Sequence, residues 1–299
     1  MSSAEERVAL TVEEATAGAV VVGADGSEPS LRAVRWAARE AAMRGAGLTV
    51  CCVAVAGTDE QPMLWDGQQL VLIPADEVLG RAIRVATDTA ADVAVAGDVL
   101  RGDPAYQLLA RAREAELLVV GARGLGAFVG LLVGSVSEHV AGRADCPVVV
   151  VRGEASPDLP VLVGVDGSAA NQAAVGFAFA AAARRGVELV ALSAAEPEWI
   201  RPAVGSPATP VVDIEGVEHA ARGRLDDALR QWTDRYPDLP VRRVAVPGGA
   251  ARALIEASSR ASLAVVGSRG HGTLSGVFLG SVSRHLMRHA DCPVAIVRG

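Results

Sequence analysis

Two glycine-rich segments of this chain have the residue types and the spacing to bind an anion. The first, GARGLGAFVGLLVGSVSEH, spans residues 121–139, and the second, GSRGHGTLSGVFLGSVSRH, spans residues 267–285. Glycine has no Cβ, so backbone N–H groups can come close to a ligand. A helix that begins after Gly-Ser adds unpaired N–H donors and the positive end of its dipole. Together these features predict a phosphate cradle that needs no lysine.

The candidate residues of each cradle are loop glycines, a loop arginine and the first residues of the following helix. They are Gly121, Arg123, Gly124, Gly134, Ser135, Val136 and Ser137, and in the second segment Gly267, Arg269, Gly270, Gly280, Ser281, Val282 and Ser283. Glycines that only form turns and close helix packing are the alternative. The same spacing occurs twice while neighbouring residues differ, which favours ligand binding. His271, inside the second loop, is expected to be a surface residue rather than a phosphate contact.

An Asp-Gly-Ser turn follows the first expected strand of each half. It contains Asp25 in GADGS and Asp166 in GVDGS. A carboxylate at this place can accept hydrogen bonds from a ribose or from an exocyclic amine. The alternative is a plain Asp-Gly turn with a serine helix cap. In a doubly wound sheet, Asp25 should lie across the topological switch point from the glycine loop, so we expect the two motifs to form one site.

The same succession of strands and helices occurs twice in the sequence and must position these motifs. Residues 102–153 align without gaps to residues 248–299, at a constant offset of 146. The repeat predicts an N-terminal tail at 1–17, a domain at 18–153, a linker at 154–159 and a second domain at 160–299. Short apolar runs alternate with amphipathic ones, which is typical of a parallel sheet covered by helices on both faces. The expected fold is therefore α/β, with two homologous doubly wound five-stranded parallel-sheet domains of the Rossmann-like kind.

The first half shows this alternation most clearly. Its expected strands are residues 19–23, 48–55, 93–97, 116–120 and 146–151, and its expected helices are residues 31–45, 76–90, 105–115 and 135–144. Ligands of such sheets bind outside the carboxyl ends of the strands. The motifs occupy those ends, since Gly23 and Gly121 each directly follow a run of apolar strand residues.

Composition excludes several functions. The 299-residue chain has a net charge of −7, which argues against a nucleic-acid partner. It contains no lysine, and a P-loop needs one. Its four cysteines form no C-x-x-C pair and are expected to be small buried hydrophobes in a reducing compartment. Neither a signal peptide nor an apolar run of about 18 residues is found. A cytoplasmic protein without membrane insertion is expected.

The pattern G-x2-G-x9-G-S, found twice together with D-G-S, resembles the ATP-binding signature of the universal stress protein family. The likeness is to a tandem-domain member from a high-GC actinobacterium, and it covers residues 18–299. It implies ATP with Mg²⁺ in each half, hence two ATP per chain, with Asp25 and Asp166 at the nucleoside. It also implies an adenine contact through the backbone of a second-strand residue, matched here to Val53 and Leu192. Pairing of the two last strands and a homodimer of the chain follow from the same resemblance.

The resemblance implies a non-enzymatic regulator of stress response or dormancy, whose nucleotide state sets its conformation or its partners. A slow ATPase or phosphotransferase using the same sites is the alternative. Phosphoryl transfer needs a metal-holding carboxylate and a group that orients the nucleophile, whereas each half places one shared acid in a site motif. A dinucleotide dehydrogenase is excluded, because G-x-G-x-x-G does not follow the first strand. Residues 57–75 and 196–217 differ most between the halves and are candidates for contacts with a regulatory protein partner.

Overall fold

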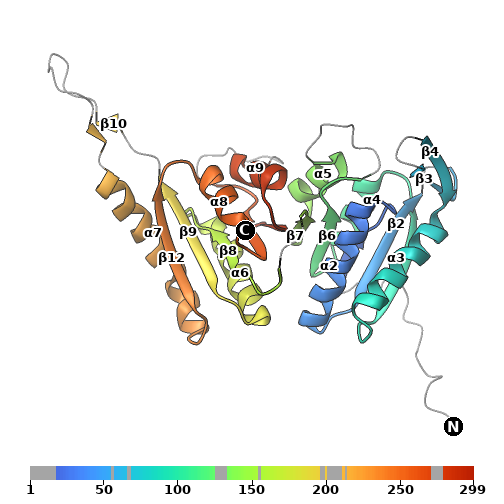
Figure 1. Ribbon diagram of the computed structural model, residues 1–299, viewed down its shortest axis with the longest axis horizontal. Helices are drawn as coiled ribbons and strands as arrows, with labels where there is room; N and C mark the ends of the chain where they lie inside the picture. Colours follow the sequence, from blue (N-terminus) through green and yellow to red (C-terminus); the bar gives the residue numbers. More distant parts are fainter. Residues whose placement is uncertain are drawn as a thin grey trace, which may run out of the picture. The chain divides into compact units, whose positions relative to one another are not determined.

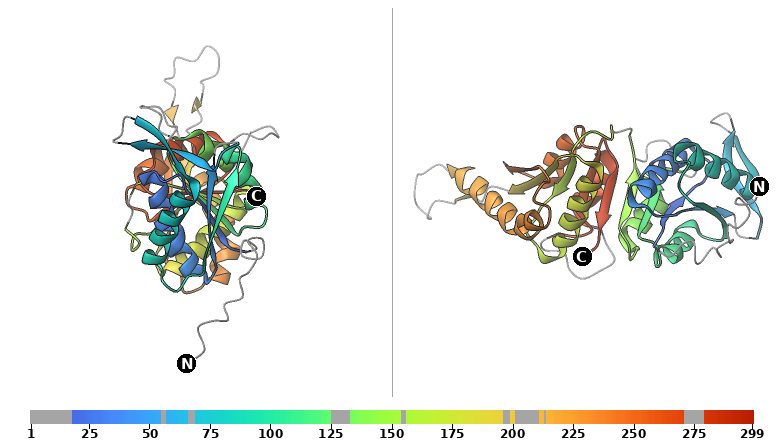
Figure 2. Two further views of the ribbon diagram at one scale, coloured as in Figure 1. Left: turned by 90° about the vertical axis from the view of Figure 1, so that its right-hand side faces the viewer. Right: turned by 90° about the horizontal axis from the view of Figure 1, so that it is seen from below.

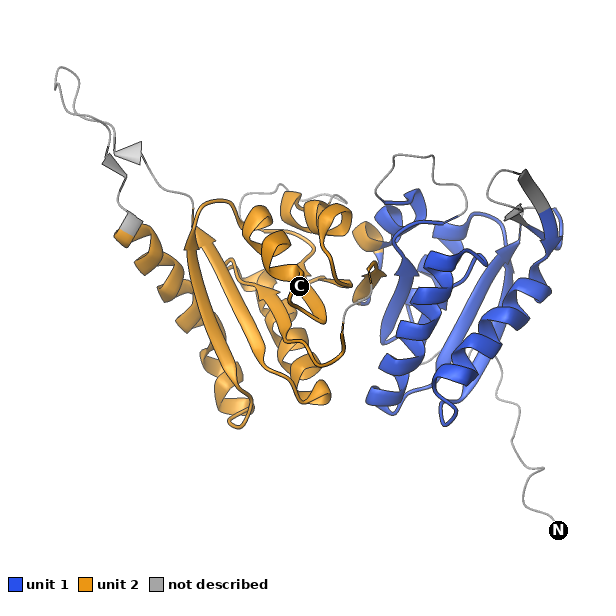
Figure 3. Cartoon of the chain, viewed as in Figure 1, with its two compact units in different colours: residues 1–140, 144–146 blue, residues 141–143, 147–299 orange. Residues whose placement is uncertain are grey.

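A computed structural model describes residues 18–54, 57–65, 69–124, 133–153, 156–195, 199–200, 211–212, 214–270 and 279–299. The chain divides into two compact units (Figure 3): unit 1 is Met1–Val140 with Ala144–Cys146, and unit 2 is Ala141–Arg143 with Pro147–Gly299. Each unit is an α/β structure whose helices cover a mostly parallel sheet, as Figures 1 and 2 show. The expected fold class is confirmed.

The sheet of unit 1 contains parallel strands in the order β6-β1-β2-β5. The strands are β1 (Val20–Gly23), β2 (Leu48–Ala54), β5 (Val95–Arg101) and β6 (Leu117–Gly121). The helices are α2 (Glu28–Arg44), α3 (Ala75–Thr89), α4 (Pro104–Ala112) and α5 (Ser135–Arg143). The chain runs from β1 outward to β5 and then returns to β6 on the other side of β1. The strand order therefore reverses between β1 and β6, and their carboxyl ends form the switch point.

Local sequence explains why these elements form. Every residue of β2 and β6 is buried, as expected for central strands of a covered parallel sheet. Helix α2 begins after Ser27, whose hydroxyl accepts a hydrogen bond from the N–H of Ser30, and Pro29 lies in its first turn. It ends at Gly45, which adopts the left-handed conformation with φ of 64°. Both helix signals therefore fix where the chain leaves β1 and enters β2.

A β-hairpin in unit 1 was not expected from the sequence. Strands β3 (Glu60–Trp65) and β4 (Gln69–Pro74) pair antiparallel, with Gln61 opposite Ile73. The hairpin lies within residues 57–75, which the sequence analysis considered only as a partner-binding segment. Two runs of strand-forming residues around Asp66-Gly67 were the available signal. The hairpin brings Gln61, which is buried, to the carboxyl end of the sheet.

Unit 2 repeats the order of unit 1 in β12-β9-β8-β13 and adds β14 and β7 beyond β13. Its last pair is antiparallel: Val150 of β7 lies opposite Val294 of β14, so the expected pairing of the two last strands is present. The strands are β7 (Val148–Val151), β8 (Val161–Gly164), β9 (Leu189–Ala195), β10 (Trp199–Ile200), β11 (Val211–Val212), β12 (Val241–Pro247), β13 (Leu263–Gly267) and β14 (Val294–Val297). The helices are η1 (Ala169–Asn171), α6 (Gln172–Arg185), α7 (Ile214–Arg235), α8 (Ala250–Ser258) and α9 (Ser281–His289).

Most expected boundaries agree with the structure to within a few residues. The strand expected at 93–97 is instead Val95–Arg101, because it pairs with β2 along the whole of Leu48–Ala54. The helix expected at 105–115 begins at Pro104 and ends at Ala112. Among the helices that the structure describes, none is both long and apolar enough to cross a membrane.

The four cysteines are free and buried, and we predict that they do not react in the folded chain. Burial raises the pKa of Cys51, Cys52 and Cys292 from 9.0 to about 12 and that of Cys146 to about 11. The thiolate fraction at pH 8 is then lowered by roughly a hundred- to a thousand-fold relative to a free thiol. Iodoacetamide should label no thiol of the folded chain and four after unfolding. Rapid labelling of the folded chain at pH 8 would contradict this account.

Candidate functional site

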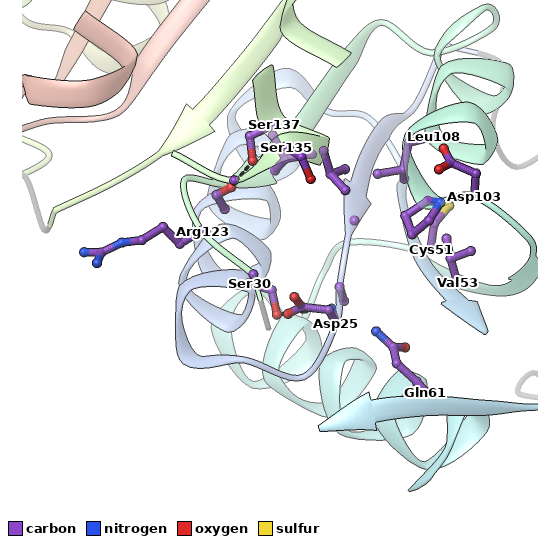
Figure 4. Close-up of a pocket in the computed structure, with 18 of the residues that line it drawn as sticks. Asp25, Ser30, Cys51, Val53, Gln61, Asp103, Leu108, Arg123, Ser135 and Ser137 are labelled. Atoms are coloured by element: carbon purple, nitrogen blue, oxygen red, sulfur yellow. Dashed lines mark hydrogen bonds between the residues drawn. The ribbon is translucent and has the colours of Figure 1, made fainter. Parts of the chain in front are cut away.

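A cavity of about 630 Å³ opens at the switch point of unit 1. The ends of β1, β2 and β6, the start of α4 and the start of α5 form its walls, and Gln61 of the hairpin also lines it (Figure 4). Its lining includes Asp25, Val53, Gly121, Arg123, Gly124, Gly134, Ser135, Val136 and Ser137, which are the candidates predicted for the first half. Residues more than a hundred positions apart in the sequence thus line one cavity.

The aspartate side chain of the Asp-Gly-Ser turn lies against the backbone of the glycine loop. Asp25 Oδ1 accepts hydrogen bonds from the N–H and the hydroxyl of Ser27, at 3.0 and 2.6 Å. Its other oxygen, Oδ2, lies so close to Gly124 that a Cβ on this glycine would overlap it. The carboxylate therefore stands against the loop, and glycine at position 124 permits the approach.

The two ends of the glycine loop are tied together by the protein itself. The N–H of Gly134 donates to the carbonyl of Ala122 at 2.8 Å. The buried hydroxyl of Ser137 donates to the carbonyl of Gly121 at 2.7 Å. These bonds hold the start of α5 against the end of β6. Ser137 thereby has a structural task, whereas Ser135 is exposed at the rim.

Helix α5 directs its N-terminus at the cavity. Its N-cap is Gly134, and no side chain caps it. The first N–H groups of a helix have no partner within the helix, so those of Ser135, Val136 and Ser137 are donors at the positive end of the dipole. All three residues line the cavity. The arrangement is suited to an anion.

Packing explains why one loop residue, Gly121, is a glycine, but it does not explain Gly134. A Cβ on Gly121 would lie 2.8 Å from the carbonyl oxygen of Pro29, so close packing against the start of α2 explains this residue. A Cβ on Gly134 would lie 3.6 Å from the backbone nitrogen of Gly124, an ordinary contact. Gly134 has φ of −76° and ψ of 153°, which any residue can adopt. Neither backbone conformation nor packing within the described chain therefore requires glycine at position 134.

The backbone of Val53 faces the switch point. The carbonyl of Cys51 accepts from the N–H of Ala24 at 2.8 Å and so is directed toward β1. Alternate residues of a strand direct their backbone groups to the same side, so those of Val53 are also directed toward β1. Strand β1 has already ended at Gly23, and Val53 lines the cavity. Its N–H and C=O are thus placed to meet a ligand.

Val53 and Leu192, which the sequence analysis matched to one another, are not equivalent. Leu192 pairs with Gly164 exactly as Cys51 pairs with Gly23. The counterpart of Val53 is therefore Ala194, which lies two residues further along β9. Leu192 and Ala194 both line the cavity of unit 2. The second strand contains no motif from which the match between the two halves could be predicted.

Arg123 is part of the lining, but its side chain is exposed and points away from the other labelled residues (Figure 4). The sequence analysis did not identify Gln61, Cys51, Asp103 and Leu108, which also line the cavity. Asp103 caps α4 by accepting from the N–H of Tyr106 at 2.9 Å, and Asp-Pro before a helix is a signal for such a cap. No local signal indicates Gln61, because only the fold of the hairpin brings it here.

Unit 2 keeps the same connections around a smaller cavity of about 190 Å³. Asp166 Oδ1 accepts from the N–H of Ser168 at 2.8 Å, and a Cβ on Gly270 would lie 3.0 Å from Asp166 Oδ2. The hydroxyl of Ser283 donates to Gly267 at 2.6 Å. The lining includes the predicted residues Asp166, Leu192, Gly267, Arg269, Gly270, Gly280, Ser281, Val282 and Ser283. His271 lies outside the described residues.

The contrast between Gly124 and Gly134 predicts unequal effects of the same substitution. Gly124→Ala should lower the free energy of unfolding by about 1–3 kcal/mol, since the new Cβ displaces Asp25 from its bonds to Ser27. Gly134→Ala should change it by less than about 1 kcal/mol, because its Cβ makes ordinary contacts. Urea unfolding of both variants measures the difference. Equal losses would show that position 134 is also a packing site.

Comparison with known proteins places the two repeats in one family. The profile of the universal stress protein family matches residues 17–152 and 159–298. A universal stress protein of Mycobacterium tuberculosis (strain H37Rv) is 38% identical over 290 residues, covering 93% of this chain and 96% of that protein. One from Mycolicibacterium smegmatis is 37% identical over 298 residues, covering 96% and 99%. The crystal structure of a universal stress protein from Archaeoglobus fulgidus shares the fold, with a TM-score of 0.62, 21% identity and coverage of 93% and 97%. This chain belongs to the universal stress protein family and carries its domain twice.

Proposed function

We propose that unit 1 binds ATP and that the chain is a regulator whose nucleotide state sets its conformation or its partner. The observation that carries the proposal is Gly134. It stands at the uncapped start of α5, beside a cavity of about 630 Å³, and nothing in the described protein requires a glycine there. A ligand held between the loop and the helix supplies the missing reason.

The phosphate end of the ligand would lie at α5. A Cβ on Gly134 would lie 3.6 Å from the backbone nitrogen of Gly124, so Gly134 lies beside the loop backbone and directly precedes the N–H groups of the helix. Phosphate oxygens accept hydrogen bonds from such groups and carry the negative charge that a helix N-terminus favours. A lysine is not needed in this arrangement, which agrees with a chain that has none.

The nucleoside end would lie between Asp25 and Val53. The carboxylate of Asp25 can accept from ribose hydroxyls. The backbone of Val53 offers a donor beside an acceptor, and adenine presents a ring-nitrogen acceptor beside an exocyclic amine donor. A volume of about 630 Å³ lies within the range of roughly 300–1,000 Å³ that is usual for small-molecule sites.

Mg²⁺ fits this site as a companion of the nucleotide. Among the residues that the structure describes, no group of three or more His, Cys, Asp and Glu side chains is placed to hold a metal ion. Mg²⁺ usually keeps several waters and binds substrate phosphates in addition to few protein ligands. The ion would neutralise phosphate charge. Ser135 carries the exposed hydroxyl at the start of α5 that would lie nearest to it.

The same chemistry favours a regulator over a slow ATPase or phosphotransferase. Phosphoryl transfer needs a residue that holds the metal ion and one that orients the attacking group. Asp25 is the acid of the cavity nearest the loop, and one of its oxygens is already bonded twice to Ser27. The proposal also includes a homodimer, a cytoplasmic location and a regulatory protein partner. Membership of the family is the support for these three.

Binding of ATP to the full chain tests the proposal, with Gly134→Ala as the variant and Gly80→Ala as its control. Gly80 lies in α3 of the same unit and does not line the cavity, and a Cβ there would also lie 3.6 Å from its nearest neighbour. Titration calorimetry with ATP and Mg²⁺ should give equal Kd values for the wild type and Gly80→Ala. Gly134→Ala should weaken binding at least tenfold, about 1.4 kcal/mol, without a change in stability.

Two results would contradict the proposal. Absence of ATP binding by the wild-type chain would remove the function itself. Unchanged affinity in Gly134→Ala would place the phosphates away from the start of α5.

A further inference from the structure

The cavities of the two units differ about threefold in volume although their motifs are the same. Unit 1 has about 630 Å³ and unit 2 about 190 Å³. The phosphate ends do not account for the difference, because Gly280, like Gly134, caps its helix without a side chain and its Cβ would make only a 3.5 Å contact. The linings differ at the other end: that of unit 1 includes Ala54, Gln61, Gly102 and Asp103, whereas that of unit 2 includes Ala194 and Ala250.

Arg224 of α7 bonds to the end of β9 beside this cavity. Its Nη2 donates to the carbonyl of Ala194 at 3.2 Å, and its Nε donates to the hydroxyl of Ser193 at 3.3 Å. Its aliphatic stem packs on the first turn, since a Cβ on Gly167 would lie 3.2 Å from both Cγ and Cδ of Arg224. One side chain thus connects the turn beside Asp166 to the end of β9.

The carbonyl that Arg224 occupies is the counterpart of the one proposed to meet adenine. The carbonyl of Leu192 accepts from Val165 at 2.8 Å, so Ala194 is directed toward the switch point as Val53 is in unit 1. In unit 1 the residue that carries this carbonyl, Val53, lines the large cavity. In unit 2 a guanidinium already bonds to it, and a nucleobase would have to displace that bond.

Unit 1 has two apolar residues at the positions that Arg224 and Ser193 occupy in unit 2. The offset of 146 residues that relates β5 to β12 assigns Val78 to the position of Arg224, and strand register assigns Cys52 to the position of Ser193. Val78 and Cys52 are buried in one cluster with Ala54 and Ala75. Valine has no donor with which to bond the carbonyl of Val53 as Arg224 bonds the carbonyl of Ala194.

We propose that Arg224 is a specificity-determining residue that closes the nucleoside end of the unit 2 site, so that the saturated chain holds one ATP, in unit 1. The proposal rests on the proposed function of unit 1. A volume of about 190 Å³ lies below the roughly 300 Å³ at which small-molecule sites begin. The two units then have different tasks: unit 1 senses the nucleotide, and unit 2 keeps the fold of a sensor with its base site closed.

Stoichiometry measured on the full chain tests this. Equilibrium dialysis against ATP and Mg²⁺, at ten times the Kd of the wild type, should give one ATP per chain. Arg224→Val, which introduces the residue type of unit 1, should give two. Arg222→Val is the matched control, because Arg222 lies on the same helix, exposed and paired with Glu218, and it should give one. Ser193→Cys combined with Arg224→Val restores the whole unit 1 pair and should also give two.

The glycine variants identify the unit that binds. With Arg224 present, Gly280→Ala should leave one ATP per chain. A site that binds tenfold more weakly is about half filled at this ATP concentration, so Gly134→Ala should leave about 0.5 ATP per chain or less. Two ATP on the wild-type chain, or loss of binding in Gly280→Ala, would overturn the inference while leaving nucleotide binding intact. One ATP on both the Arg224→Val chain and the double variant, each folded by circular dichroism, would also overturn it. No ATP on the wild type would instead refute the proposed function.

Discussion

The site depends on the approach of the Asp25 carboxylate to the bare backbone of Gly124. One oxygen of the carboxylate is fixed by Ser27 at the start of α2, and the other stands where a Cβ on Gly124 would be. This contact joins the end of β1 to the loop after β6, the two strands between which the sheet order reverses. The loop is then closed by Gly134 and Ser137, which set the start of α5. Sheet topology, turn and helix thereby converge on one cavity.

Because the domain occurs twice, the proposed phosphate end and the proposed nucleoside end of the site can each be compared between the two units. Both units keep the aspartate against a glycine, the serine bonded to the strand end and the uncapped helix. They differ where α3 and α7 pack on the second strand, with Val78 and Cys52 in one unit and Arg224 and Ser193 in the other. The repeated loop therefore predicts a phosphate cradle in each unit, but it does not predict the wall of the proposed base site.

Sequence alone predicted the order of strands and helices, because buried parallel strands are continuous apolar runs and the helices are amphipathic. It also predicted the glycine loops and the aspartate turn, because both are local patterns that occur twice. It did not predict the hairpin that brings in Gln61, the register that makes Ala194 the counterpart of Val53, or the reach of Arg224 to Ala194. These depend on contacts between residues about 12 to 30 positions apart in the chain, and only the packed fold sets them.

The central claim is that one nucleotide lies between the start of α5 and the end of β2 in unit 1. A crystal structure of the full chain grown with ATP and Mg²⁺ tests it most directly. The account predicts phosphates at the backbone N–H groups of Ser135–Ser137, adenine at the backbone of Val53, and Arg224 still bonded to Ala194 in unit 2. A nucleotide bound elsewhere, or adenine in place of the Arg224 guanidinium at Ala194, would contradict it.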